Sequence, residues 1–179
     1  MPKQNRGPYI LAAGAAAQLL TGIPAAWGVF QQPVMDEYGL SEQGAGYAFG
    51  ILIAAFGVGC VLGGFLQDSR GPRCAALWGT ALLCGGFFAA AILPGGSAGS
   101  FFLAFSIPAG LGTAFLYPSI QSCAQKWYAG RKGLATGVIG GAVGLSGAFL
   151  TVFVRTAVSG FGIVQGIRGA FWALGAVTL

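Results

Sequence analysis

The charged residues of the chain fall in a few short groups, and long uncharged stretches separate them. No Asp, Glu, Lys or Arg occurs within residues 7–35, 43–67, 74–125 or 133–154. A bilayer core about 30 Å thick needs roughly 20 helical residues to cross it. The turn-forming sequence PGGSAGS at 94–100 divides the longest stretch into two pieces of span length. The pattern predicts membrane spans at about 9–30, 44–66, 74–93, 101–124 and 133–154, and the start of a sixth at 169–179.

Composition supports the same class. Only 7% of the residues are charged and 55% are apolar, whereas a soluble domain has about 25% charged residues. The sequence therefore predicts an all-α, polytopic protein whose first partner is the lipid bilayer. The net charge of +5 does not indicate nucleic acid, because the basic residues flank apolar runs and do not gather on one polar face. The first apolar stretch is longer than a signal-peptide core, so we interpret it as a retained helix.

The distribution of basic residues predicts the orientation in the membrane. With the N-terminus in the cytoplasm, the segments on that side hold Lys3, Arg6, Arg70, Arg73, Lys126, Arg131 and Lys132. The segments on the other side then hold Arg155 and Arg168. Because Lys and Arg concentrate in cytoplasmic loops, a cytoplasmic N-terminus is expected.

The last apolar stretch is too short to cross a bilayer. Residues 169–179 extend over roughly 16 Å as a helix, about half of the hydrocarbon core. The final carbonyls would lie in lipid without partners. The sequence therefore leads us to expect a truncated sixth helix and an incomplete chain.

A very short charged turn joins the second and third predicted spans. Gly71 and Pro72 supply a break that neither helix can run through. Asp68 stands at the C-terminal end of a helix, where the negative end of the macrodipole destabilises a carboxylate by about 0.3–1 kcal/mol. We therefore expect Asp68 to have a positive partner, either an arginine or a helix N-terminus. The alternative is a solvated loop carboxylate.

The residues of this turn also carry a resemblance. The pattern G-x-L-x-D-x-x-G-x-R, formed by Gly64, Leu66, Asp68, Gly71 and Arg73, resembles the loop signature of the major facilitator superfamily, and Arg70 lies within it. The stretches 25–41, 109–137 and 166–176 resemble, in the same order, further segments of the oxalate/formate antiporter and monocarboxylate porter branches of that family.

This resemblance implies a fold and a mechanism. The family has twelve helices in two halves of six, and the halves rock about a central solute site. Residues 1–179 then correspond to the N-terminal six-helix half with its sixth helix truncated, and the C-terminal half is absent. The family also implies that Asp68 meets a helix N-terminus of the second half. The implied function is transport of a small organic anion, and the alternative is a truncated half that does not transport.

Few polar residues inside the spans are candidates for solute contact. Tyr117 matches a cavity-facing tyrosine of the oxalate/formate branch and stands beside Pro118, which can open a kink. Gln18 and Thr21 are further cavity candidates, although each can instead bond within or between helices. Trp27 stands near a span end and is interpreted as an interface anchor.

Glycine is frequent within the spans. Gly137, Gly140, Gly144 and Gly147 lie three and four residues apart and so share one helix face, which we interpret as a helix-packing surface. The sequence GLSG at 144–147 mimics a serine-protease motif, but the chain has no histidine to act as base, so no catalytic residue is expected. The four cysteines have no metal-ligand spacing, and we expect neither a metal site nor a cofactor.

Overall fold

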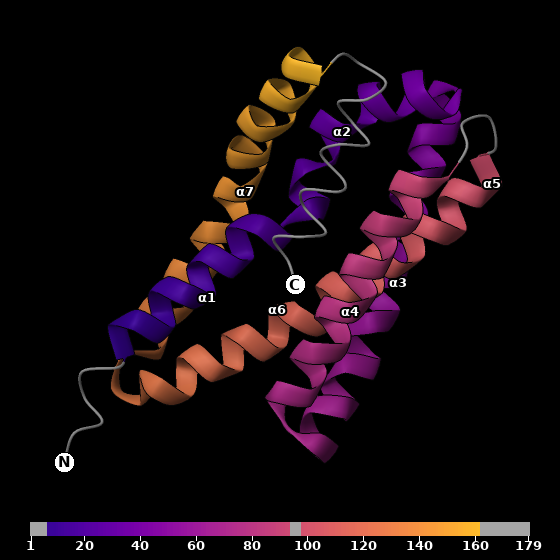
Figure 1. The fold of residues 1–179 in the computed structure, drawn as a ribbon. Helices are drawn as coiled ribbons and strands as arrows, with labels where there is room; N and C mark the ends of the chain where they lie inside the picture. The colour runs from indigo at the N-terminus through magenta and orange to yellow at the C-terminus, as the bar shows by residue number, and fades with distance from the viewer. Residues whose placement is uncertain (1–6, 94–97, 162–179) are drawn as a thin grey trace.

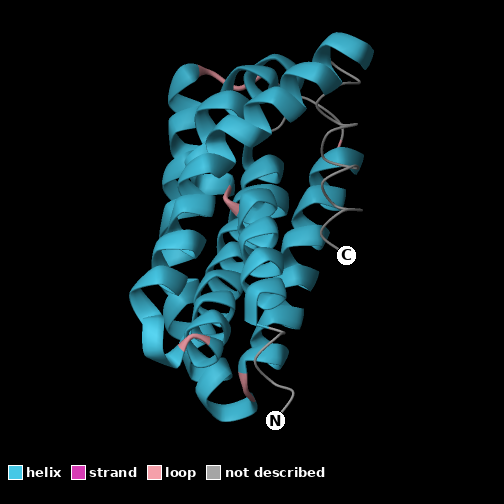
Figure 2. Cartoon of the chain, turned by 90° about the vertical axis from the view of Figure 1, so that its left-hand side faces the viewer, coloured by secondary structure: helices cyan, strands magenta, loops and turns pink. Residues whose placement is uncertain are grey.

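The computed structural model describes residues 7–93 and 98–161, and these residues are almost entirely helical with no strand among them (Figures 1 and 2). Short connections join the long helical segments, so successive segments run in opposite directions, whereas α1 continues into α2 and α5 continues through η2 into α6. The elements are α1 Gly7–Thr21, α2 Ile23–Tyr38, α3 Glu42–Arg70, α4 Pro72–Ile92, α5 Ala98–Phe101, the π-helical turn η2 Phe102–Ser106, α6 Ile107–Trp127, the 3-10 turn η3 Ala129–Arg131 and α7 Lys132–Phe161.

Five helical segments of the described residues are long and apolar enough to cross a membrane. They are Gly7–Tyr38, Glu42–Arg70, Pro72–Ile92, Gly99–Trp127 and Ala129–Val152. The predicted all-α, polytopic membrane fold is therefore confirmed. The helices extend a few residues beyond the charge-free ranges because charged residues can continue a helix into the headgroup region. The predicted sixth span at 169–179 lies outside the described residues.

The first span is broken, which the sequence analysis did not predict. Gly22 is the one non-helical residue between α1 and α2, and Figure 1 shows the two helices meeting at an angle there. Pro24, in the first turn of α2, has no N–H to donate to the carbonyl of residue 20, so the helical ladder cannot continue. The N–H of Ala25 turns back to the Gly22 oxygen at 3.1 Å.

Helix α6 lies against both α3 and α4, and these three helices form the most extensively packed part of the bundle (Figure 1). Glycines bring the backbones together. A Cβ atom on Gly110 would lie 2.4 Å from the Leu52 oxygen of α3. A Cβ atom on Gly112 would lie 2.7 Å from the Gly79 oxygen of α4. Because lipid is as apolar as the helices, such close van der Waals contact is what holds them together.

A cluster of aromatic side chains fills the part of the bundle near the α2–α3 connection. Trp27 stacks on Phe49 and Phe105 with ring centroids 6.1 and 6.3 Å apart, and it is only 5% exposed. The interpretation of Trp27 as an interface anchor is therefore wrong. The Tyr38 ring packs on Phe101, and its hydroxyl donates to the Ala90 carbonyl of α4. These contacts tie the end of α2 to α4.

The π-helical turn in the fourth span has a local cause. Pro108 has no N–H for the Ala104 carbonyl, and its ring would crowd that carbonyl in a regular helix. The Ile107 N–H bonds to the Phe102 oxygen instead, which adds one residue to the turn. Gly86 of α4 packs against this wider turn, since a Cβ there would lie 3.2 Å from Pro108.

Helix α7 packs along α1 and α2 by one apolar face (Figure 1). The buried residues of that face recur every three or four positions and are Ala135, Ile139, Ala142, Ser146 and Leu150.

The glycine face predicted on α7 is different from this one. A Cβ on Gly137, Gly140 or Gly144 would meet nothing within 4 Å, so these three make no helix contact within the described residues. Gly147 does, since its Cβ would lie 3.0 Å from the Ala25 oxygen. Spacing alone identified a face but could not identify which helix, if any, covers it.

Candidate functional site

The turn between α3 and α4 depends on glycine. Gly71 is the single residue between the helices, with φ 87° and ψ 163°. This region of backbone conformation is open almost only to glycine. The Gly71 N–H caps α3 by donating to the Gln67 oxygen at 2.9 Å, and Pro72 starts α4 at a position where no N–H is needed. The sequence GPR therefore gives a sharp reversal of the chain.

The charged residues of this turn extend into solvent. Asp68, Arg70 and Arg73 are all exposed, and within residues 7–93 and 98–161 no ion pair or hydrogen bond involves the Asp68 carboxylate. The nearest side-chain bond of the turn is local, from the Ser69 hydroxyl to the Leu66 oxygen. Gly64 is half-buried, with open space where a Cβ would stand. The positive partner expected for Asp68 stays a prediction.

Gln18 and Thr21 lie inside the bundle and do not line an open surface. Both are buried, and the Thr21 hydroxyl lies 2.9 Å from the Ala17 oxygen and 3.2 Å from the Gln18 Oε1. The Gln18 side chain is 1% exposed, yet its Nε2 has no hydrogen-bond partner in the described part of the chain. A buried polar group left unsatisfied costs about 1–3 kcal/mol. These two candidates therefore form a structural pair with one unmet hydrogen bond.

Tyr117 differs from that pair because it is half-buried and reaches the surface of the bundle. No hydrogen bond of its hydroxyl occurs among the described residues. Pro118 follows it inside α6 and removes the N–H that would bond to the Ala114 carbonyl. Of the three cavity candidates, Tyr117 alone combines an accessible polar group with a local break in the backbone ladder.

Two buried hydroxyl groups escaped the sequence analysis. The Ser146 hydroxyl of α7 lies 3.0 Å from the Gly22 oxygen at the break of the first span. The Ser106 hydroxyl, at the end of the π-helical turn, is fully buried without a partner within the described residues. The sequence did signal the break, because Gly22 stands two residues before Pro24. Nothing in the sequence indicated that the Ser146 and Ser106 hydroxyls are buried.

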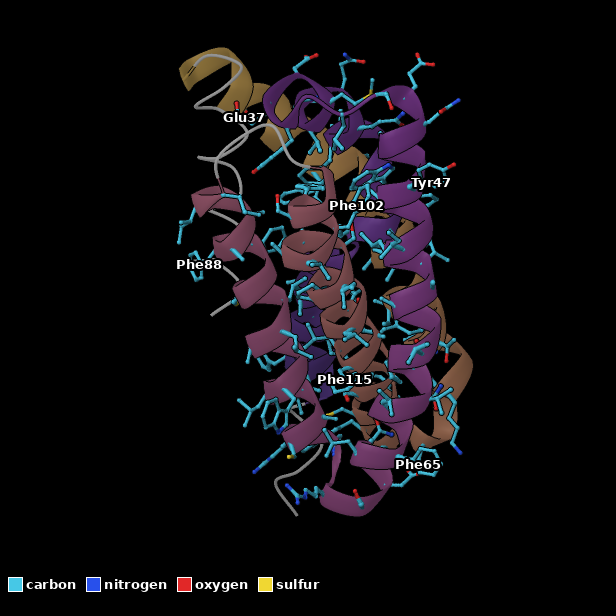
Figure 3. All side chains as sticks on the ribbon, turned by 90° about the vertical axis from the view of Figure 1, so that its right-hand side faces the viewer. Glu37, Tyr47, Phe65, Phe88, Phe102 and Phe115 are labelled. Carbon is cyan, nitrogen blue, oxygen red and sulfur yellow. The ribbon has the colours of Figure 1, made fainter. Side chains whose placement is uncertain are left out.

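The outer surface of α3 is apolar between its charged ends. Figure 3 shows Tyr47 and Phe65 directed away from the bundle and Phe115 held between helices. Tyr47 is 67% exposed and Phe65 is 73% exposed, which suits a surface that meets lipid or another apolar partner. Glu37 lies at the end of the bundle where α2 gives way to α3 (Figure 3).

Five spanning helices with charged residues near their ends define an integral, multi-pass membrane protein. Comparison with known families then gives the family itself. The chain belongs to the Major Facilitator Superfamily, whose sequence pattern it matches over residues 10–179. This membership confirms the resemblance carried by the loop signature and identifies a transporter family, not an enzyme family.

Two curated relatives align with nearly the whole chain. The chain is 23% identical over 173 residues to a protein named oxalate:formate antiporter from Oxalobacter formigenes, covering 97% of this chain and 40% of that protein. It is 28% identical over 172 residues to an uncharacterized 38 kDa protein in the 23S RNA operon of Thermoproteus tenax, covering 96% of this chain and 43% of that protein. The chain therefore spans about two-fifths of the length of these relatives.

The conformation of Gly71 leads to a stability prediction. Gly71→Ala places a side chain at a positive φ and is expected to destabilise the fold by about 1–3 kcal/mol. Gly85→Ala is the matched control, because Gly85 lies on α4 with open space at its Cβ and Ala favours a helix. Thermal unfolding of the chain in detergent should show a lower midpoint for Gly71→Ala only. Equal midpoints for the two variants would contradict the assignment of this turn.

Proposed function

We propose that the chain is the N-terminal half of a twelve-helix carrier that moves a small organic anion, such as a mono- or dicarboxylate, by alternating access. The observation that carries the proposal is the alignment of 97% of the chain with a protein named oxalate:formate antiporter. Membership of the Major Facilitator Superfamily supports transport as the general activity. The alternative is a half that does not transport by itself.

The charge distribution supports a solute site in which the two halves contribute different groups. Residues 74–125, which contain α4 after Arg73 and nearly all of the fourth span, have no basic residue to bind an anion. An anion inside a membrane protein needs a cationic or hydrogen-bonding partner. In the proposed carrier the second half supplies the cation, and the Tyr117 hydroxyl donates a hydrogen bond to a carboxylate oxygen. Tyr117 is half-buried beside the break at Pro118, which supports this role.

The uncovered surfaces fit a missing partner half. Gly137, Gly140 and Gly144 leave open space on α7, and small residues allow a helix backbone to approach closely. The exposed Asp68 carboxylate fits the N-terminus of a helix of that half, whose dipole would stabilise it. With the N-terminus in the cytoplasm, this contact closes the cytoplasmic end of the solute path.

Uptake measurements test the proposal. Two preparations are compared in proteoliposomes, residues 1–179 alone and the longest natural reading frame that contains them. Saturable uptake of labelled oxalate, formate or lactate is expected from the longer protein and not from residues 1–179, since the solute path lies between two halves. Uptake by residues 1–179 alone would show that one half suffices. Absence of carboxylate uptake by both would contradict the proposed substrate class.

The proposed role of Asp68 gives a separate prediction in the longer protein. Asp68→Asn removes the charge that faces the helix N-terminus and is expected to lower the uptake rate roughly two- to fivefold, given about 0.3–1 kcal/mol for such a contact. Glu42→Gln is the control, because Glu42 is a carboxylate at the opposite end of the same helix. Equal rates for the two variants would argue against a gating contact at Asp68.

A further inference from the structure

The break in the first span separates two packing regions. Leu11 of α1 belongs to an apolar cluster with Ala124 of α6 and Ile139 of α7. From Ile23 onward, the residues of α2 belong to the larger cluster that includes the aromatic side chains of α3, α4 and the fourth span. Gly22 lies between these clusters. Helix α7 packs along both arms of the first span, whereas only α2 also packs into the aromatic cluster.

One hydroxyl at this junction has two acceptors. The Ser146 Oγ lies 3.0 Å from the Gly22 oxygen and 2.6 Å from the Val143 oxygen of its own helix. A serine hydroxyl carries a single proton, so the two carbonyl oxygens compete for it. Thr151, a turn further along α7, bonds instead to the Gly147 oxygen of its own helix.

The approach of Ser146 requires glycine at position 22. A Cβ on Gly22 would lie 2.0 Å from the Ser146 Oγ and 2.5 Å from the Ser146 Cβ. Any side chain there would force α7 away from the break. The absence of a side chain at Gly22 therefore serves this contact, and α7 touches the first span at the point where its helix is interrupted.

The observed arrangement leaves one polar group of the same face unsatisfied. Gln18 lies one turn before Gly22, so the two share a helix face, and the Gln18 Nε2 is buried without a partner among the described residues. A buried unsatisfied donor one turn before the break, together with a hydroxyl that has two acceptors at the break, points to more than one arrangement of these contacts.

We propose that Gly22 is a hinge of the first span and that Ser146 is the positioning residue that latches it. The bond to the Gly22 oxygen holds α1 and α2 at the observed angle. When the hydroxyl rotates and donates only to the Val143 oxygen, the break is released from α7 and α1 can pivot. The inference deepens the proposed function, on which it rests, by naming the element of this half that changes shape in the transport cycle.

Pulsed electron paramagnetic resonance measures the distance between two spin labels, and a pair of labels on α1 and α3 reports a change in the angle between α1 and α2. The measurement needs no solute. Spin labels replace Tyr9, at the start of α1, and Tyr47, on α3, both of which are exposed. The cysteines of residues 1–179 are replaced, and the chain is placed in lipid nanodiscs. Ser146→Ala removes the latch and is expected to increase the population outside the main distance peak roughly two- to tenfold, as loss of one hydrogen bond implies. Ser146→Thr restores the hydroxyl, and Thr151→Ala is the matched control; both should match the parent.

A latch at Ser146 requires that the distance between the two spin labels changes when this hydroxyl is removed and not when another hydroxyl of α7 is removed. If Ser146→Ala does not fold, Ser146→Gly serves in its place, because it also removes the hydroxyl and adds no bulk at Gly22. A distance distribution that stays unchanged without the hydroxyl would overturn the proposal, as would equal broadening in Thr151→Ala. Carboxylate uptake does not enter this readout, so failure of the proposed function leaves the hinge result intact.

Discussion

The close approach of the backbones of α3, α4 and α6 is the interaction on which the rest of the structure depends. In lipid there is no hydrophobic gain from bringing apolar helices together, so contact distance and shape decide the association. Gly110 and Gly112 of α6 place its backbone directly on Leu52 of α3 and Gly79 of α4. Larger residues at these positions would separate the helices and forfeit the dispersion contacts along their length. The fourth span is therefore the centre of the bundle.

Helices α1 and α2 contact this centre through different sets of side chains. The aromatic cluster around Trp27 and Phe105 fixes α2, whereas α1 packs against α7 and the C-terminal part of α6. The junction between these two attachments falls at Gly22, where the helical ladder is already interrupted. The buried polar groups Gln18 and Ser146 lie near this junction, whereas Asp68 is exposed and Tyr117 is half-buried. The described residues thus combine a tightly packed centre, a first span broken at Gly22, and two polar side chains, Tyr117 and Asp68, that have no hydrogen-bond partner among them.

Much of this fold could be predicted from the sequence because lipid imposes strict rules. Charge-free stretches of span length indicated the helices, and Gly71 followed by Pro72 indicated the turn. The break at Gly22 was missed because the apolar pattern is the same for a continuous and a bent helix, and only Gly22 followed by Pro24 indicated it. The assignment of Trp27 was wrong, and three of the four α7 glycines meet no helix within the described residues, because position along a span does not reveal which neighbour lies opposite. Gln18 and Thr21 were suitable in chemistry, but only the packing shows that they are buried.

Disulfide cross-linking in the membrane tests the central claim, that glycine lets α3 and α6 touch. A Cβ on Gly59 would lie 2.7 Å from the Ala114 Cβ, so a small outward movement brings cysteines at these positions to the roughly 3.5–4.5 Å that a disulfide needs. Gly57 stands on the same helix with open space at its Cβ and provides the control. In a background without the native cysteines, the account predicts rapid oxidation of the Gly59→Cys, Ala114→Cys pair and none of the Gly57→Cys, Ala114→Cys pair. Equal cross-linking of both pairs, or none of either, would contradict it.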